Sequence, residues 1–367
     1  MKKPFFACVA TLVVLGCLNV AASFISPRSS VFWDNPLMVM YPVTGFDPNV
    51  TLDRVNSNNS PTRLVRYVPD ENRWYRLDPE PSIPEGRLVL NFGDSSTWGW
   101  GLERQNDAYS GDLQSGLPSD VTSVNLGVPG YTSAQGVRYL QELLPAVADR
   151  TVAVTLYFGN NDSTENGTSD NERIGRESWQ MQTVLREIAL YRLLRQAVPH
   201  GALSNTDPRV NPNDYEANMR TMIALSRSYG IPVVVIIPPV PITWQPAHLT
   251  ALRSLAPNVT NVWSREELET AQGEHQRGID LIEHGDDTGI AFLTESVEHD
   301  WVVPRAKQAW RQRLAKLAAI PGVQVVEASA VHPSAEYPYN FEDYCHPTPR
   351  LHSQIAQQIS TALAQEI

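Results

Sequence analysis

From residue 87 onward, short continuous runs of apolar residues alternate with amphipathic stretches. Apolar runs of this length, without a polar residue at every second position, are typical of strands buried on both faces of a sheet. The runs cover residues 87–92, 121–128, 151–158, 231–237 and 322–328. Between the second and third runs, residues 133–147 place their apolar side chains on one face of a predicted helix: Val137, Leu140, Leu144 and Val147.

Two further stretches carry start and stop signals for helices. Pro212 begins one that ends at Gly230, and Thr348-Pro349 begins another whose apolar residues recur every four positions: Leu351, Ile355, Ile359 and Leu363. Alternating strands and helices predict an α/β fold, a three-layer α/β/α sandwich in which helices cover both faces of a parallel sheet. Residues 163–211 and 241–320 are too long for simple crossovers, so we expect helical insertions there.

The first 86 residues have a different character. Lys2 and Lys3 precede an apolar run over residues 5–25, which predicts a signal peptide or signal anchor at 1–25. Residues 26–86, rich in Pro, Asn, Asp and Arg, are interpreted as a linker and irregular lead-in to a main domain at 87–367. The charge bias places that domain outside the cytoplasm: periplasmic, secreted, or tethered to a membrane through residues 5–25.

Charge and cysteine content limit the possible binding partners and disulfides. The formal net charge is −11 with no basic stretch, which argues against nucleic acid and anionic membrane surfaces as main partners. Cys8 and Cys17 lie in the N-terminal apolar run, so Cys345 is alone in the main domain and no disulfide can form within it. The sequence gives no indication of the oligomeric state.

Polar or glycine-rich segments follow the first three predicted strands. They are Gly93-Asp94-Ser95, Asn125 to Gly130, and Gly159-Asn160-Asn161-Asp162. Open α/β sheets bind ligands at the carboxyl ends of their strands, which is where these segments are expected. Each also has a structural explanation: a serine that caps a helix, a glycine in a turn, and an asparagine in an Asx turn.

A fourth segment, Asp343-Tyr344-Cys345-His346, precedes the last predicted helix. An aspartate three residues before a histidine can accept a hydrogen bond from one ring nitrogen and leave the other as a general base. A capping turn would use the same residues. His352 is near, but two histidines and one carboxylate make a thin ligand set, so we predict no metal and no cofactor.

In order and placement, the four segments together resemble the conserved blocks of the SGNH (GDSL-like) hydrolase superfamily, over residues 87–367. The resemblance implies a doubly wound, five-stranded parallel sheet of flavodoxin-like order. It also implies Ser95 as nucleophile, with Asp343 and His346 completing a catalytic triad. An oxyanion would be bound by the backbone N–H groups of Ser95 and Gly130 and by the side chain of Asn161.

The implied function is a serine esterase that hydrolyses carboxylic O-acyl esters, short-chain or acetyl, on a small molecule or a polysaccharide. Two alternatives stay open: an O-acetyltransferase acting on a cell-surface polysaccharide with the same triad, and a non-catalytic binding module. The chain departs from the family at Asn160, where glycine or histidine is common. Ser96 directly follows the nucleophile position, and Cys345 is interpreted as a packing residue.

Overall fold

The computed structural model describes residues 14–21, 65–68, 73–76, 83–102, 107–128, 130–164, 169–171, 190, 208–246, 265–301, 303–328 and 340–364. Its centre is a parallel sheet of β3 (Arg87–Gly93), β4 (Val121–Gly127), β5 (Thr151–Tyr157), β6 (Val233–Ile237) and β7 (Val323–Glu327). The strand order is β4-β3-β5-β6-β7, the flavodoxin-like order of a doubly wound sheet. The predicted fold class is confirmed.

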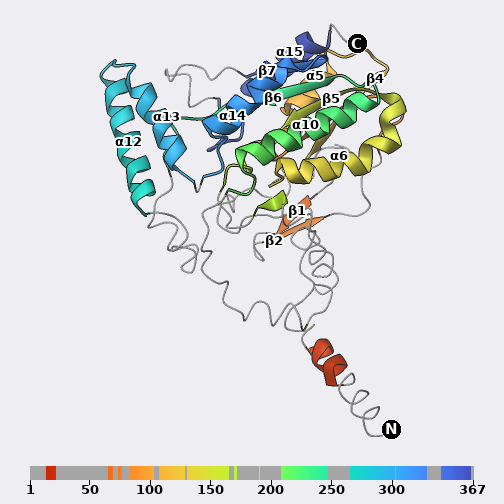
Figure 1. Cartoon of the computed structure of the whole chain (residues 1–367), viewed down its shortest axis with the longest axis horizontal. Helices are drawn as coiled ribbons and strands as arrows, with labels where there is room; N and C mark the ends of the chain where they lie inside the picture. The colour runs from red at the N-terminus through yellow and green to blue at the C-terminus, as the bar shows by residue number, and fades with distance from the viewer. Residues whose placement is uncertain are drawn as a thin grey trace.

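Helices cover the sheet on both faces (Figure 1). One face packs against α6 (Ser133–Val147), α10 (Pro212–Ser228) and α14 (Gln308–Ala315), and the other against α5 (Tyr109–Gln114) and α15 (Pro349–Leu363). Short 3-10 helices follow α6 at Ala148–Arg150 and α14 at Lys316–Ala319. Because side chains alternate along a strand, β3 supplies Leu88, Leu90 and Phe92 to the first face and Val89 to the second.

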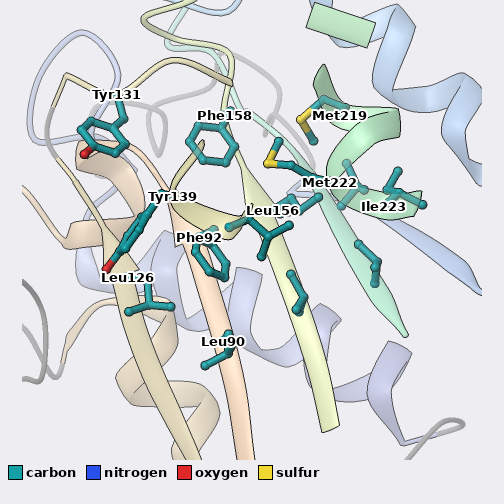
Figure 2. Packing of buried hydrophobic residues seen from close by; sticks show 14 of the residues in the cluster. Leu90, Phe92, Leu126, Tyr131, Tyr139, Leu156, Phe158, Met219, Met222 and Ile223 are labelled. Atoms are coloured by element: carbon teal, nitrogen blue, oxygen red, sulfur yellow. The ribbon is translucent and has the colours of Figure 1, made fainter. Parts of the chain in front are cut away.

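Interlocking aromatic rings pack beneath the loop that follows β4 (Figure 2). The Tyr139 ring meets Phe92 edge-on at 5.3 Å between centroids and Tyr131 at 6.3 Å. All three side chains are buried, and burial of such a ring contributes roughly 1.5–3 kcal/mol. Tyr131 therefore anchors in the core the loop that carries Gly130.

The predicted elements differ from the structure in two details. Strand β7 was expected to be buried on both faces, but only Val323 is buried, because β7 lies at the edge of the sheet. Thr348 stands at the N-cap of α15, yet its side chain makes no capping hydrogen bond. The predicted bounds of α6 agree with the structure, and α10 begins at Pro212 as expected.

The second insertion is helical, as predicted. Helices α12 (Arg265–Glu283) and α13 (Gly289–His299) lie side by side, to one side of the sandwich (Figure 1). Gly278 and Gly289 bring them together, because a Cβ on Gly289 would overlap the carbonyl of Gly278. In the first insertion, a predicted helix over residues 177–195 lies outside the described residues apart from Leu190.

Before the sheet, β1 (Val65–Val68) and β2 (Arg73–Arg76) form an antiparallel hairpin that the sequence did not predict. Residues 14–21 of the N-terminal apolar run are helical. Within the described part of the chain, no helix has both the length and the apolar character needed to cross a bilayer.

Candidate active site

Ser95 lies at a sharp turn between β3 and the single-turn helix α4 (Ser95–Trp98). Gly93 makes the turn possible, because a Cβ there would overlap the Thr97 side chain and the Tyr157 carbonyl. Asp94 caps α4, its Oδ1 accepting the Ser96 N–H at 2.8 Å. Ser95 is thereby fixed at the carboxyl end of β3, with its side chain turned toward the segment that precedes α15.

That segment brings His346 to Ser95. The Nε2 atom of His346 lies 2.7 Å from Ser95 Oγ, and its Nδ1 lies 2.8 and 2.7 Å from the two carboxylate oxygens of Asp343. Asp343 Oδ1 also accepts the backbone N–H groups of Cys345 and His346, each at 3.0 Å, which folds the segment into a tight turn. A continuous hydrogen-bonded series therefore joins Ser95, His346 and Asp343.

The electrostatics favour an ionised Asp343. Burial opposes its ionisation, but the positive charge of His346 and the hydrogen bonds from His346 and Cys345 outweigh burial and hold its pKa below the usual value. A carboxylate facing Nδ1 keeps the ring proton on that nitrogen. The other nitrogen, Nε2, is then available as an acceptor for the Ser95 proton.

The two other predicted site residues lie on neighbouring loops. Gly130 follows β4 with φ +80°, a conformation that glycine adopts without strain. Asn161 follows β5, and its side-chain amide donates to the Tyr131 carbonyl at 3.1 Å and to Asp94 Oδ2 at 3.4 Å. The Asn161 amide thus contacts both the turn that carries Ser95 and the residue after Gly130.

Two carboxyl groups of the predicted segments, which had no predicted role, are buried close by. Asp94 has its pKa raised to about 6 by burial, against the opposing effect of the Ser96 hydrogen bonds and the His346 charge. Asp162 has its pKa raised to about 7 by burial, and its Oδ1 accepts the N–H and the hydroxyl of Ser133 at 2.9 and 2.5 Å. The Asp162 carboxyl therefore fixes the start of α6 and with it the loop that carries Gly130.

The contacts of Ser96 and Cys345 indicate structural roles. The Ser96 hydroxyl donates to the Cys345 carbonyl at 3.3 Å and accepts from Asn160 Nδ2 at 3.2 Å. Asn160, at the position where the chain departs from the family, also accepts the Ala306 N–H at 3.1 Å. The Cys345 thiol is buried, and burial together with the nearby carboxylates raises its pKa well above the usual value. A neutral, enclosed thiol is a poor nucleophile.

Among the described residues, one group has ligand atoms close enough to hold a metal ion: those of Asp343, Cys345 and His346 lie within 4.8 Å of one another. A metal ion there would have to replace the hydrogen bonds between Asp343 and His346. His352 lies elsewhere in the core, where its Nδ1 accepts the Tyr109 N–H at 3.1 Å. Burial and the His346 charge lower the pKa of His352 to about 3.

Comparison with known proteins identifies the family of the chain. The model of the GDSL-like lipase/acylhydrolase family matches residues 92–353, most of the chain. The chain belongs to this family. It is therefore an enzyme that hydrolyses esters, and the predicted family membership is confirmed. The comparison with curated proteins gave no match.

Several solved structures are similar at low identity. TesA is 15% identical, with 77% of this chain and 100% of that chain covered and a TM-score of 0.39. The M. smegmatis aryl esterase is 15% identical, with 77% and 100% covered and a TM-score of 0.40. A lipolytic G-D-S-L family protein from Veillonella parvula is 12% identical, with 76% and 99% covered and a TM-score of 0.40.

Proposed function

We propose that the chain is a serine esterase in which Ser95 is the nucleophile, His346 the general base and Asp343 its orienting carboxylate. The observation that carries the proposal is the pair of short contacts on His346, to Ser95 Oγ at 2.7 Å and to Asp343 at 2.7 Å. Nucleophilic catalysis by serine needs a base within hydrogen-bond reach and a third group that orients the base.

The reaction follows from this geometry. The Ser95 oxygen attacks the ester carbonyl carbon while its proton passes to His346 Nε2, and Asp343 stabilises the resulting imidazolium. His346 then donates that proton to the departing alcohol, which leaves Ser95 acylated. Water, deprotonated by His346, attacks the acyl carbonyl, and cleavage of the Ser95 ester releases the acid and restores the serine.

The oxyanion that forms in each step needs hydrogen-bond donors. The backbone N–H groups of Ser95 and Gly130 and the Asn161 amide are our candidates, and loss of one such donor typically slows a reaction by 10²–10³. Asn161 has two amide hydrogens. In the free protein both have acceptors nearby, Tyr131 O at 3.1 Å and Asp94 Oδ2 at 3.4 Å. The longer of these two contacts is the one that an oxyanion would replace.

The acyl group proposed is short-chain or acetyl, on a small molecule or a polysaccharide. Trp98 and Trp100 stand beside the nucleophile turn, but their side chains are 2% and 4% exposed. They therefore pack in the core and offer no platform for stacking on a sugar ring. Export of the domain, predicted from residues 5–25, stays a prediction.

The proposal is tested with a fluorophosphonate probe and a short-chain aryl ester. We expect stoichiometric labelling of Ser95 and steady ester turnover, both abolished by Ser95→Ala. Ser96→Ala keeps much of the turnover, because the Ser96 hydroxyl bonds to neighbouring structural groups, among them the Cys345 carbonyl and Asn160. Labelling at Ser96, or turnover that survives Ser95→Ala, would overturn the assignment. Adding an oligosaccharide acceptor separates hydrolysis from acyl transfer: free acid supports the esterase, and an acylated sugar formed in its place supports the transferase.

A further inference from the structure

Arg209 contacts both loops that carry the candidate oxyanion donors. Its backbone N–H donates to the Thr164 carbonyl at 2.7 Å, and Thr164 Oγ1 donates to the Asn161 carbonyl at 2.8 Å. Its side chain turns the other way, and Nη1 donates to the Gly130 carbonyl at 3.0 Å. One residue therefore joins the turn of Asn161 to the loop of Gly130.

The Arg209 guanidinium is itself held in place. Its Nε and Nη2 both donate to Asp170 Oδ2, at 3.1 and 2.9 Å, and the two side chains are 1% and 0% exposed. Nη2 also donates to Gln135 Oε1 at 3.2 Å. The planar guanidinium donates in fixed directions, so these bonds determine where Nη1 points.

The same two acceptors bind the loop that follows Gly130. Thr132 donates its hydroxyl to Asp170 Oδ2 at 3.0 Å and its backbone N–H to Gln135 Oε1 at 2.8 Å. The loop of Gly130 is thus attached to the Arg209–Asp170 pair both at Gly130 and at Thr132. Because donors of Arg209 and Thr132 meet at the same two acceptor atoms, Asp170 Oδ2 and Gln135 Oε1, the positions of the two residues are coupled.

Stability alone does not explain this pair. Burying two charges costs about as much as their attraction returns, and apolar residues of similar volume are often as stable or more so. Catalysis, however, depends on the placement of donors around the oxyanion, and a displacement of about 1 Å can cost about a hundredfold in rate. Arg209 binds the Gly130 carbonyl and so fixes the loop whose N–H group must be placed for the oxyanion.

We infer that Arg209 is a positioning residue that holds the loops of Gly130 and Asn161 in the spacing that the oxyanion requires. The inference rests on the proposed function, because it assumes that these two residues bind the oxyanion. Arg209 itself touches no reacting atom. Its removal should therefore lower kcat per active site and leave the affinity for substrate nearly unchanged.

The chain contains a matched control. Arg305 and Asp300 form a second buried ion pair, with 2.8 Å between Nη2 and Oδ2 and side chains 1% and 0% exposed. The Arg305 side chain donates to the carbonyl of Trp244 at 3.1 Å and makes no hydrogen bond to either candidate oxyanion loop within the described residues. Its backbone carbonyl accepts the Ser163 hydroxyl at 2.7 Å, a bond that substitution of the side chain leaves in place. Changes at this pair test for the general effect of disturbing a buried salt bridge.

The experiment compares R209M/D170L with R305M/D300L, and R209K with R305K. Active-site titration with the fluorophosphonate gives kcat per competent Ser95, so an unfolded fraction does not contribute. We expect R209M/D170L to be folded and at least about tenfold slower in kcat, with KM changed less than about threefold. R209K should be slower than wild type by a smaller factor, because it keeps the charge but loses the fork of donors. Both Arg305 variants should stay within about twofold.

A second readout distinguishes positioning from a looser fold. A boronic acid that adds to Ser95 presents a negatively charged tetrahedral group to the same donors, so its affinity should fall by the same factor as kcat/KM in the Arg209 variants. Equal kcat per site in the Arg209 and Arg305 variants would overturn the inference. If R209M/D170L does not fold, the comparison of R209K with R305K decides in the same way. A wild-type protein without ester turnover would overturn the proposed function itself, a result distinct from either comparison.

Discussion

Replacing Asp343 by asparagine tests the geometry of the candidate triad with a change of one atom. Asp343 Oδ1 accepts two backbone N–H groups, from Cys345 and His346, and lies 2.8 Å from His346 Nδ1, while Oδ2 lies 2.7 Å from the same nitrogen. An asparagine in the same position keeps its amide oxygen at Oδ1, where it still accepts both backbone N–H groups. The amide NH₂ then takes the place of Oδ2. The turn should survive, with only a small change in melting temperature.

The loss in rate has two sources. A carboxylate and an imidazolium with about 4 Å between their charge centres attract by roughly 4 kcal/mol at an effective dielectric constant of about 20. Loss of that attraction in the transition state corresponds to about a thousandfold in kcat. In addition, the asparagine NH₂ takes the Oδ2 position, the nearer of the two to Nδ1, where it donates to that nitrogen and favours the tautomer with its proton on Nε2, which cannot accept the Ser95 proton. Together we expect kcat to fall by about 10³–10⁴.

The assay is steady-state turnover of a short-chain aryl ester near pH 8, normalised to folded protein and followed beside a thermal melt. Glu342→Gln is the matched control, because Glu342 is the exposed carboxylate next in sequence, and it should stay within about twofold of wild type. A kcat for Asp343→Asn within tenfold of wild type, with a normal melt, would refute the role of Asp343. A melting temperature that collapses would refute our account of the turn.

Three further changes test neighbouring features. Cys345→Ser should leave kcat within about twofold, measured by ester turnover, because the buried thiol is neutral. Gly127→Ala should lower the melting temperature and the turnover together, since a Cβ there would overlap the Trp98 backbone beside the nucleophile turn. Asp162→Asn should flatten the pH dependence of stability. An unfolded aspartate ionises near pH 3.8 and the folded Asp162 near 7, so the folded protein holds an extra proton between these values and loses stability as pH rises through them. From pH 5 to pH 8 this costs wild type about 3 kcal/mol, and chemical denaturation of both proteins at the two pH values measures the difference.

The sheet was predictable because its strands are mostly apolar, and two of them, β3 and β4, end at glycines that sterics require. Gly93 at the end of β3 is one, since no side chain fits between Thr97 and the Tyr157 carbonyl. The meeting of Ser95 with His346, 251 positions later, came from the resemblance to a family and not from any local pattern. The order of the family's segments along the chain predicts contacts between distant residues, whereas hydrophobic periodicity predicts only local elements.

Arg209 and Asp170 could not be predicted in the same way. Neither follows one of the predicted strands, and their pairing depends on how the segment before α10 packs against the turn of Asn161. The β1–β2 hairpin was missed for a related reason, because its two strands, VRYV and RWYR, do not alternate apolar and polar residues. No local pattern in a single sequence predicts contacts between irregular segments.

Two buried carboxyl groups at the carboxyl end of the sheet each fix the direction of a backbone N–H group. Asp94 and Asp162 are fully buried, and burial raises the pKa of each, which means that the folded state penalises their charged forms. Each carboxyl nevertheless accepts a backbone N–H at the first turn of a helix, Ser96 in α4 and Ser133 in α6. Apolar side chains could fill the same volume at lower cost, but they could not fix the direction of an N–H group. The site therefore gives up some stability to hold its loops in one conformation, as expected where a rate depends on fractions of an ångström.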